Sequence, residues 1–253
     1  MNKIAIGTIY RSEILRFLRT LTQSFLSPVL SAMLYFIVFG AAIGPRVQEI
    51  GGVSYGQFIV PGIILLTVMT QSISNAAFGI FFPKFTRTTY ELLSAPVDFF
   101  EIMCGYVGAA ATKSLSIGLV ILVAANFFVD LQIEYPIIMV LLLVLTCICF
   151  ALFGFIIGIW ANNFEQLQVI PLMLVTPLVF LGGSFYSLKD LPPVWQTITL
   201  FNPVSYLISG FRWTFFGQAD VPVVYSLLAL GIFSLGCIIM IWWIFRTGWR
   251  LRT

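Results

Sequence analysis

Lys113 is the charged residue that the sequence places deepest within a long apolar stretch. It ends the segment Gly108-Ala-Ala-Ala-Thr-Lys113, which superficially resembles a phosphate-binding P-loop. A P-loop needs glycines one and six residues before its lysine, and Thr112 and Val107 stand there, so no nucleotide site is predicted. An ionisable group within an apolar span is costly, which makes Lys113 the candidate intramembrane polar site. Lys113 either contacts an anionic headgroup or substrate, or is a structural lysine that snorkels or pairs within the bundle, and we favour the structural role.

Metal-binding and nucleophilic chemistry are poorly supported. The sequence contains no histidine, which excludes His-ligated metals and nucleophile–histidine pairs. Cys147 and Cys149 point about 200° apart around a helix, so they cannot share a metal. We expect all four cysteines to be buried small hydrophobic residues: Cys104, Cys147, Cys149 and Cys237. No cofactor or metal is predicted in this chain.

The carboxylates also lack a catalytic pattern. Asp130, Glu134 and Glu165 lie near the ends of apolar runs, not deep within them. A proton- or sodium-driven carrier usually needs buried carboxylates or unwound polar helices at the midplane. A membrane-embedded lipid-modifying enzyme needs a carboxylate pair or an activated nucleophile. Because the sequence offers neither, an ATP-independent carrier or channel is our second interpretation and such an enzyme our third.

The composition indicates an integral membrane protein. The 253 residues are 60% hydrophobic and 9% charged, against roughly 45–50% and about 25% in soluble domains. Thirteen basic and ten acidic residues are too few to solvate a soluble protein of this size. The net charge of +3 is small and gives no indication of a nucleic-acid partner.

Charge-free runs predict an all-α bundle of six transmembrane helices. A helix needs about 20 apolar residues to cross a bilayer, and six stretches satisfy this: 24–44, 58–82, 102–128, 136–160, 166–187 and 222–245. No hydrophilic stretch is long enough for another domain, so one membrane domain is expected over residues 1–253, with its bundle at about 24–245.

The basic residues predict that both termini are cytoplasmic. Positive charge concentrates on the cytoplasmic side of membrane proteins, and this orientation puts nine basic residues inside and three outside. The inner nine are Lys3, Arg11, Arg16, Arg19, Lys84, Arg87, Arg246, Arg250 and Arg252, and the outer three are Arg46, Lys189 and Arg212.

An amphipathic helix is predicted at about residues 3–22. One face of its helical wheel is apolar, and the opposite face is polar and basic, which is typical of a helix lying in the membrane interface. The apolar face carries Ile14, Leu15, Phe17, Leu18, Leu21 and Phe25, and the polar face carries Ser12, Arg16, Arg19 and Gln23.

The inner loop between the second and third spans predicts a short helix. Thr88 and Glu91 have the spacing of a capping box. Pro96 cannot continue that helix and suits the first turn of the next. Leu92 and Leu93 then form an apolar knob, which either docks another protein or packs back onto the bundle.

The outer segment between the fifth and sixth spans is apolar but too broken to cross the membrane. Residues 194–200 and 204–216 are separated by Asn202-Pro203. We expect two short re-entrant or interfacial helices there.

Two Gly-x-x-x-Gly pairs permit close helix contact. They are Gly40 with Gly44, and Gly154 with Gly158. Either could lie at a subunit interface, and packing within one subunit is the interpretation that we favour.

Taken together, the six spans, the basic amphipathic start and the inner Glu91-Leu-Leu-Ser-Ala-Pro96 loop resemble the type-2 (ABC-2) permeases of ATP-binding-cassette exporters. The outer segment strengthens the resemblance, and within the family the sequence looks closest to the YadH/NodJ-like bacterial permeases. The elements of the outer segment that match the family's C-terminal signature are Leu178-x-x-Leu181-Gly182-x-Ser184, Leu191-Pro192, Pro203-x-x-Tyr206 and Arg212.

The resemblance implies a permease subunit in the bacterial cytoplasmic (inner) membrane that is not itself an enzyme. It implies a permease dimer and a separate cytoplasmic ABC ATPase subunit that binds ATP and Mg. It also implies export of an amphiphilic or lipid-linked substrate, and outer re-entrant helices that carry Pro203, Tyr206 and Arg212. The turn that would couple to the ATPase is formed by Tyr90, Glu91, Leu92, Leu93, Ser94, Ala95 and Pro96.

Overall fold

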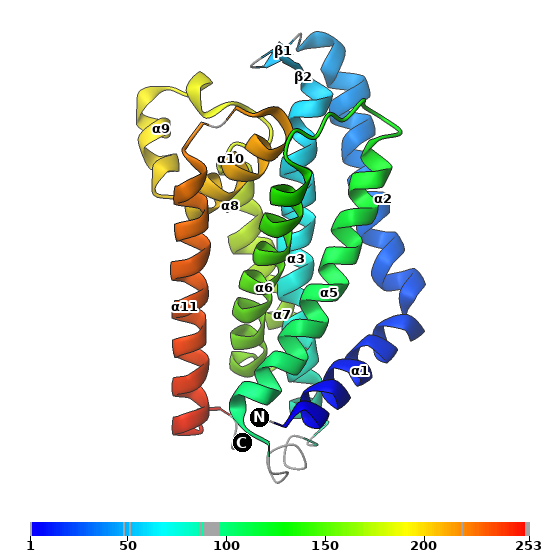
Figure 1. Ribbon diagram of the computed structural model, residues 1–253, viewed down its shortest axis with the longest axis vertical. Helices are drawn as coiled ribbons and strands as arrows, with labels where there is room; N and C mark the ends of the chain where they lie inside the picture. The colour runs from blue at the N-terminus through cyan, green and yellow to red at the C-terminus, as the bar shows by residue number, and fades with distance from the viewer. Residues whose placement is uncertain are drawn as a thin grey trace.

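The computed structural model describes residues 2–47, 49–50, 52–86, 88, 97–218 and 220–250. The chain is an all-α integral membrane protein with six candidate membrane spans (Figure 1), which confirms the predicted fold class. The six stretches are Thr22–Gly40, Tyr55–Phe85, Phe99–Ala125, Pro136–Trp160, Phe164–Leu181 and Val223–Thr247. The fifth ends earlier than expected because Gly183, at φ +84°, turns the chain away from the helix.

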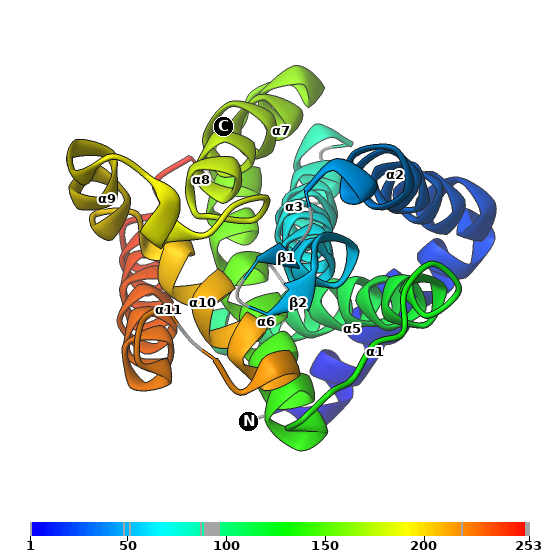
Figure 2. The ribbon, with the colours of Figure 1, turned by 90° about the horizontal axis from the view of Figure 1, so that it is seen from above.

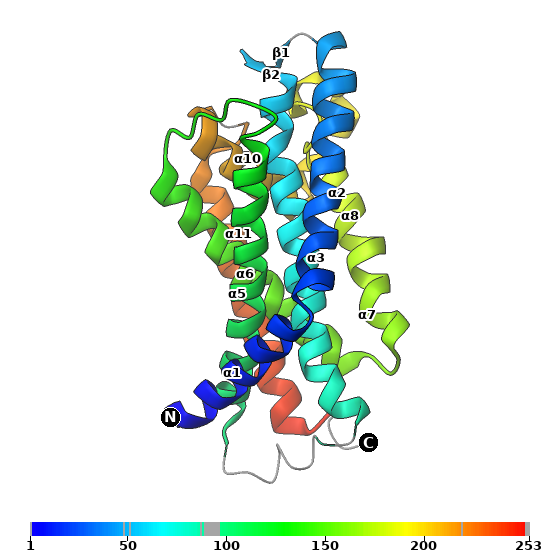
Figure 3. The same ribbon diagram turned by 90° about the vertical axis from the view of Figure 1, so that its right-hand side faces the viewer.

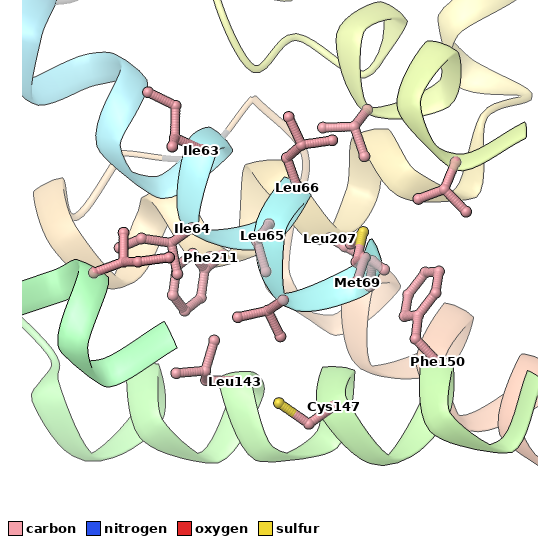
Figure 4. Close-up of a cluster of buried hydrophobic side chains, with 14 of the residues drawn as sticks. Ile63, Ile64, Leu65, Leu66, Met69, Leu143, Cys147, Phe150, Leu207 and Phe211 are labelled. Carbon is pink, nitrogen blue, oxygen red and sulfur yellow. The ribbon is translucent and has the colours of Figure 1, made fainter. Parts of the chain in front are cut away.

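Three helices form the centre of the bundle: α3 (Tyr55–Phe85), α5 (Phe99–Ala125) and α6 (Pro136–Trp160). Figure 4 shows their core, where Leu65 and Met69 of α3 approach Leu143 and Cys147 of α6. Cys147 is fully buried among apolar side chains, as expected of a small hydrophobic residue. Phe211, from a helix on the outer side, closes this cluster.

Glycines allow α6 to lie directly against α3. A Cβ atom added to Gly154 would lie 2.6 Å from Ile73 Cα, and one added to Gly158 would lie 2.9 Å from Ala77 Cα. No side chain fits at such distances, so this Gly-x-x-x-Gly pair serves packing within the subunit. At the ends of these two helices, the Lys84 ammonium donates hydrogen bonds to the carbonyls of Ile159 and Ala161.

The first and fifth spans are less regular and less enclosed. The first consists of π-helical Thr22–Leu26, α2 (Ser27–Tyr35) and π-helical Phe36–Ile43, followed by a short 3₁₀ turn, Gly44–Arg46. The fifth consists of α7 (Phe164–Ile170), π-helical Pro171–Val175 and α8 (Thr176–Leu181). Only 22% of each of these spans is buried, as is 22% of the sixth span, against 67% of α3 and α6. Both spans therefore present most of their surface outward.

A two-stranded hairpin that the sequence did not predict precedes α3. Strands β1 (Glu49–Ile50) and β2 (Val53–Ser54) pair antiparallel, with Glu49 opposite Ser54. Ser54 then begins α3 through a capping box with Gln57, which satisfies backbone groups at the helix start. A two-residue strand is too short to show the alternation of apolar and polar residues that identifies strands in a sequence.

The outer segment forms a 3₁₀ turn, Leu188–Asp190, and two short helices, α9 (Pro193–Leu200) and α10 (Pro203–Phe216). Asn202 caps α10 and Pro203 occupies its first turn, so the helix begins at the predicted break. Seen from above, α10 crosses the ends of the bundle (Figure 2), packing against α3, α6, α8 and α11 (Val223–Thr247). Re-entry of α9 and α10 into the bilayer stays a prediction.

Helix α1 (Lys3–Arg19) lies obliquely across one end of the bundle (Figure 3). Its residues Leu15 and Leu18, and Leu21 just beyond its end, point away from the protein, with 44%, 51% and 42% of their surface exposed. Glu13 and Phe17 are instead buried against the bundle. The exposed leucines suit the predicted interfacial position, which stays a prediction.

We expect Gly154→Val to weaken the bundle, because the added side chain must push α3 away from α6. Overpacking of this kind typically costs about 1–3 kcal/mol. A thermal melt in detergent would measure the effect, with Gly236→Val in α11 as the control, since a Cβ atom there meets nothing within 4 Å. Equal melting temperatures for the two variants would contradict the tight α3–α6 contact.

Candidate functional site

A polar groove lies between the first span, α3 and the fifth span. Its volume is about 440 Å³, and its wall includes nine polar or hydroxyl-bearing side chains: Ser27, Ser31 and Tyr35 from the first span, Thr67, Thr70, Gln71 and Ser74 from α3, and Gln168 and Thr176 from the fifth. Pro28, Leu66, Pro171 and Leu172 complete the wall. Figure 2 shows α3 between α2 on one side and α7 and α8 on the other.

The four polar residues that α3 contributes to the groove form a stripe near the middle of this 31-residue helix. Their spacing of three and four residues puts them on one face. The Thr67 and Thr70 hydroxyls donate to the carbonyls of Ile63 and Leu66, at 3.0 and 2.8 Å. Within the part of the chain that the structure describes, the side-chain amide of Gln71 makes no hydrogen bond. Amide groups facing hydrocarbon are costly, so this stripe requires water, substrate or another protein surface beside it.

Arg212 connects four parts of the outer end. Its guanidinium donates to the Gly183 carbonyl at 2.6 Å, lies 3.4 Å from an Asp220 oxygen, and stacks 3.8 Å from the centre of the Phe58 ring. It is only 6% exposed, and burial lowers its pKa to about 10, although Asp220 opposes that shift. Arg212 therefore holds α10 to α3, to the turn after α8 and to the segment before α11.

Tyr206 and Pro203 belong to the same outer assembly but do not contact Arg212 through any hydrogen bond. The Tyr206 hydroxyl donates to the Leu200 carbonyl at 2.7 Å, which joins α10 to the end of α9. The Tyr206 carbonyl accepts a hydrogen bond from Ser226 at the start of α11. Pro203 lies at the start of α10 and lines a small apolar cavity with Leu207 and Leu230. The three signature residues thus lie in one outer cap, each with a separate contact.

Lys113 lies near the middle of α5. Its ammonium is 3.8 Å from a carboxylate oxygen of Glu13 in α1 and 5.5 Å from the centre of the Phe17 ring. Arg16 donates to the same Glu13 oxygen at 2.5 Å. The sequence did not single out Glu13, because it falls beside the polar face of the helical wheel. Only the packing of α1 on α5 brings it to Lys113.

The predicted coupling residues, Tyr90 to Pro96, lie outside the described residues. Their flanks are described: α3 ends at Phe85, and α5 begins at Phe99. Asp98 caps α5 in a capping box with Glu101, as its position before an apolar run suggests. The ends of α3 and α5 on either side of the loop both lie near α1 (Figure 3).

The sequence pattern of the ABC-2 type transporter family matches residues 4–216. The chain belongs to the ABC-2 type transporter family. It is 40% identical to the inner membrane transport permease YadH of Escherichia coli (strain K12) over 250 residues, covering 99% of this chain and 98% of that protein.

More distant ABC-2 relatives carry the name nodulation protein J. The protein from Rhizobium leguminosarum bv. trifolii is 26% identical over 89% of this chain and 86% of its own length. The protein from Rhizobium meliloti (strain 1021) is 27% identical over 85% of this chain and 82% of its own length. The resemblance drawn from the sequence is therefore confirmed, and the chain is an integral membrane permease of this family.

The groove of this ABC-2 permease was missed by the sequence analysis, which searched the spans for charges and not for neutral polar residues. A signal was present. Thr67, Thr70, Gln71 and Ser74 repeat at helical spacing inside the second span, where Ser72 and Asn75 are polar as well. Ser27 and Ser31 have the same spacing in the first span.

We expect Arg212→Ala to destabilise the outer cap, because the Gly183 carbonyl and Asp220 lose their buried partner. Removing one member of a buried pair typically costs about 3–5 kcal/mol. Melting temperature and membrane yield would report the loss. Arg246→Ala is the matched control, since its guanidinium contacts the Trp242 ring at 5.1 Å and forms no ion pair among the described residues. An unchanged melting temperature for Arg212→Ala would refute its linking role.

Proposed function

We propose that the chain is the membrane subunit of an ABC exporter driven by a separate cytoplasmic ATPase, with both termini cytoplasmic. Membership of the ABC-2 family carries this proposal. The chain lacks a P-loop, so ATP and Mg would be bound by the partner. The charge distribution, nine basic residues at one side of the membrane and three at the other, supports the orientation.

The polar groove forms half of the transport path in this proposal. Its stripe on α3 lies near the middle of the span, where polar groups need a partner. A second copy facing the first and fifth spans would enclose the stripes of both copies between them. Those two spans are also the ones that the single chain buries least among the flanks of the groove, which fits a surface that another copy covers.

An amphiphilic or lipid-linked molecule suits the groove. Hydroxyl and amide groups line it, and none of its wall residues is charged. A polar headgroup could exchange hydrogen bonds with Gln71 and Gln168 while its hydrocarbon part stays near Leu66 and Leu172. Charged residues are not required, because the energy comes from ATP.

The coupling part of the proposal is tested by Leu92→Asp combined with Leu93→Asp. If these leucines dock on the ATPase, two charges in an apolar contact should weaken capture at least about tenfold, or 1.4 kcal/mol. Co-purification with the ATPase measures capture, and a melting curve shows that the permease still folds. Thr86→Asp with Thr88→Asp adds equal charge to the same loop as a control.

A folded Leu92/Leu93 double variant that captures the ATPase as well as the unmodified permease would eliminate the docking assignment. Glu91→Ala should have a smaller effect than the double variant, since a lost helix cap costs roughly 0.5–2 kcal/mol.

The path part of the proposal is tested by linking two copies through Ser31→Cys. With the four native cysteines replaced, a bifunctional thiol reagent in membranes should give a covalent dimer. Ile232→Cys is the control, since Ile232 is 72% exposed on α11, on the other side of the bundle from α2 (Figure 2). Dimers formed through Ile232→Cys and not through Ser31→Cys would place the contact elsewhere.

A further inference from the structure

Helix α1 follows α5 in parallel register. Near the start of both helices, the Asn2 amide donates to the Glu101 carboxylate. Further along, the Tyr10 hydroxyl donates to Thr112 at 3.0 Å, and Glu13 reaches Lys113. The contacts thus advance together along both helices, which is how two helices behave when they pack as a unit (Figures 1 and 3).

Gly105 of α5 makes room for α1, because a Cβ atom added there would lie 2.8 Å from the Cβ of Ile9. One added to Gly108 would lie 3.6 Å from the Tyr10 ring, an ordinary contact distance, so this residue also faces α1. The segment from Gly108 to Lys113, whose lysine spacing only resembles a P-loop, is therefore part of the surface that receives α1. Its glycine, threonine and lysine each contact a residue of the N-terminal helix.

The Glu13 side chain lies at the junction of three helices. It is 9% exposed, and the Lys113 side chain is 5% exposed. A Cβ atom on Gly79 of α3 would lie 3.4 Å from its carboxylate, so Glu13 lies beside α3 as well. The neighbouring Arg16 guanidinium lies 5.0 Å from the Phe78 ring of α3. Helix α1 is thus held to both helices that flank the inner loop.

The ion pair between Glu13 and Lys113 fixes the register of α1 on α5 more than it stabilises the fold. A buried ion pair is often no more stabilising than apolar residues of the same volume. Burial raises the pKa of the Glu13 carboxyl above its ordinary value, against the opposing effect of Arg16 and Lys113. A charged pair does, however, penalise every other register, because a shifted helix leaves one charge buried and alone.

We propose that Glu13 and Lys113 are positioning residues that fasten α1 to α5, so that the N-terminal helix moves with the predicted coupling turn as one body. The proposal rests on the proposed function, since it assigns α1 to the apparatus that responds to the ATPase. When the turn between Phe85 and Phe99 moves, the contact between Glu13 and Lys113 then makes α1 move with it. The span that follows α1, which borders the polar groove, is moved in turn.

The docking itself is tested without any ATPase. Ile9→Cys with Gly105→Cys, in a background lacking the native cysteines, should form a disulfide on mild oxidation. The two Cβ atoms would start 2.8 Å apart, and the helices need to separate by only about 1 Å to reach the Cβ–Cβ distance of a disulfide. Gly7→Cys with Gly105→Cys is the control, since Gly7 has nothing within 4 Å of an added Cβ atom. Equal cross-linking of the two pairs, or none of the first, would overturn the docking.

The positioning role is tested in the complex of permease and ATPase, in vesicles of phosphatidylethanolamine and phosphatidylglycerol. Lys113→Glu puts two carboxylates together and should lower ATP hydrolysis at least about fivefold, while Glu13→Lys with Lys113→Glu restores at least about half of it by re-forming the pair. The Ile9–Gly105 cysteine pair, oxidised in the Lys113→Glu background, should also restore hydrolysis, and a reductant should remove that gain.

These outcomes separate the inference from the proposed function. Unchanged hydrolysis in Lys113→Glu, or no rescue by either the charge exchange or the disulfide, overturns the positioning role while the complex itself stands. Failure of the unmodified permease to capture any ATPase overturns the proposed function, and the cross-linking result still decides whether α1 docks on α5.

Discussion

The hydrocarbon interior of a membrane offers no hydrogen-bond partner, and most features of this protein follow from that constraint. It requires the backbone to form helices across the bilayer, which the six apolar stretches do. It also makes each polar side chain within a span a feature that needs an explanation. The Thr67 and Thr70 hydroxyls donate hydrogen bonds to backbone carbonyls of their own helix, whereas Gln71 faces the groove. The groove is therefore the one part of the described bundle whose neutral polar wall calls for something outside the single chain.

The same constraint explains why the bundle is unequally packed. Helices α3, α5 and α6 bury their surfaces against each other, with Gly154 and Gly158 allowing α6 to touch the α3 backbone. The first and fifth spans contain π-helical turns and leave most of their surface uncovered. Packed cores switch between discrete arrangements and do not deform smoothly, so in the proposed transport cycle the central helices suit a rigid body. The two flanking spans suit the walls that separate.

The sequence predicts the long helices well because their signal is local. Uncharged runs and the charges that flank them are enough to predict six spans, and Asn202-Pro203 is enough to predict the break before α10. The sequence does not predict contacts between distant residues. Glu13 and Lys113 are a hundred positions apart, so nothing in either neighbourhood reveals the pair, and Lys113 alone left two interpretations open. The neutral stripe on α3 was predictable in principle, because its helical spacing is visible in the sequence.

The buried charges of this protein are paired with other protein groups, and this pairing bears on where the energy for transport enters. Among the described residues, the buried acidic and basic side chains are Glu13, Glu101, Lys113 and Arg212. Each has a protein partner: Glu13 with Lys113, Glu101 with the Asn2 amide, and Arg212 with Asp220. Charges that are already paired in fixed contacts are poor carriers of a proton or sodium gradient, which needs groups that exchange ions at the midplane. The groove is neutral. In the proposed function it accommodates a polar headgroup, and the driving force reaches it mechanically through the helices. The helices placed to receive it are those that meet at Glu13.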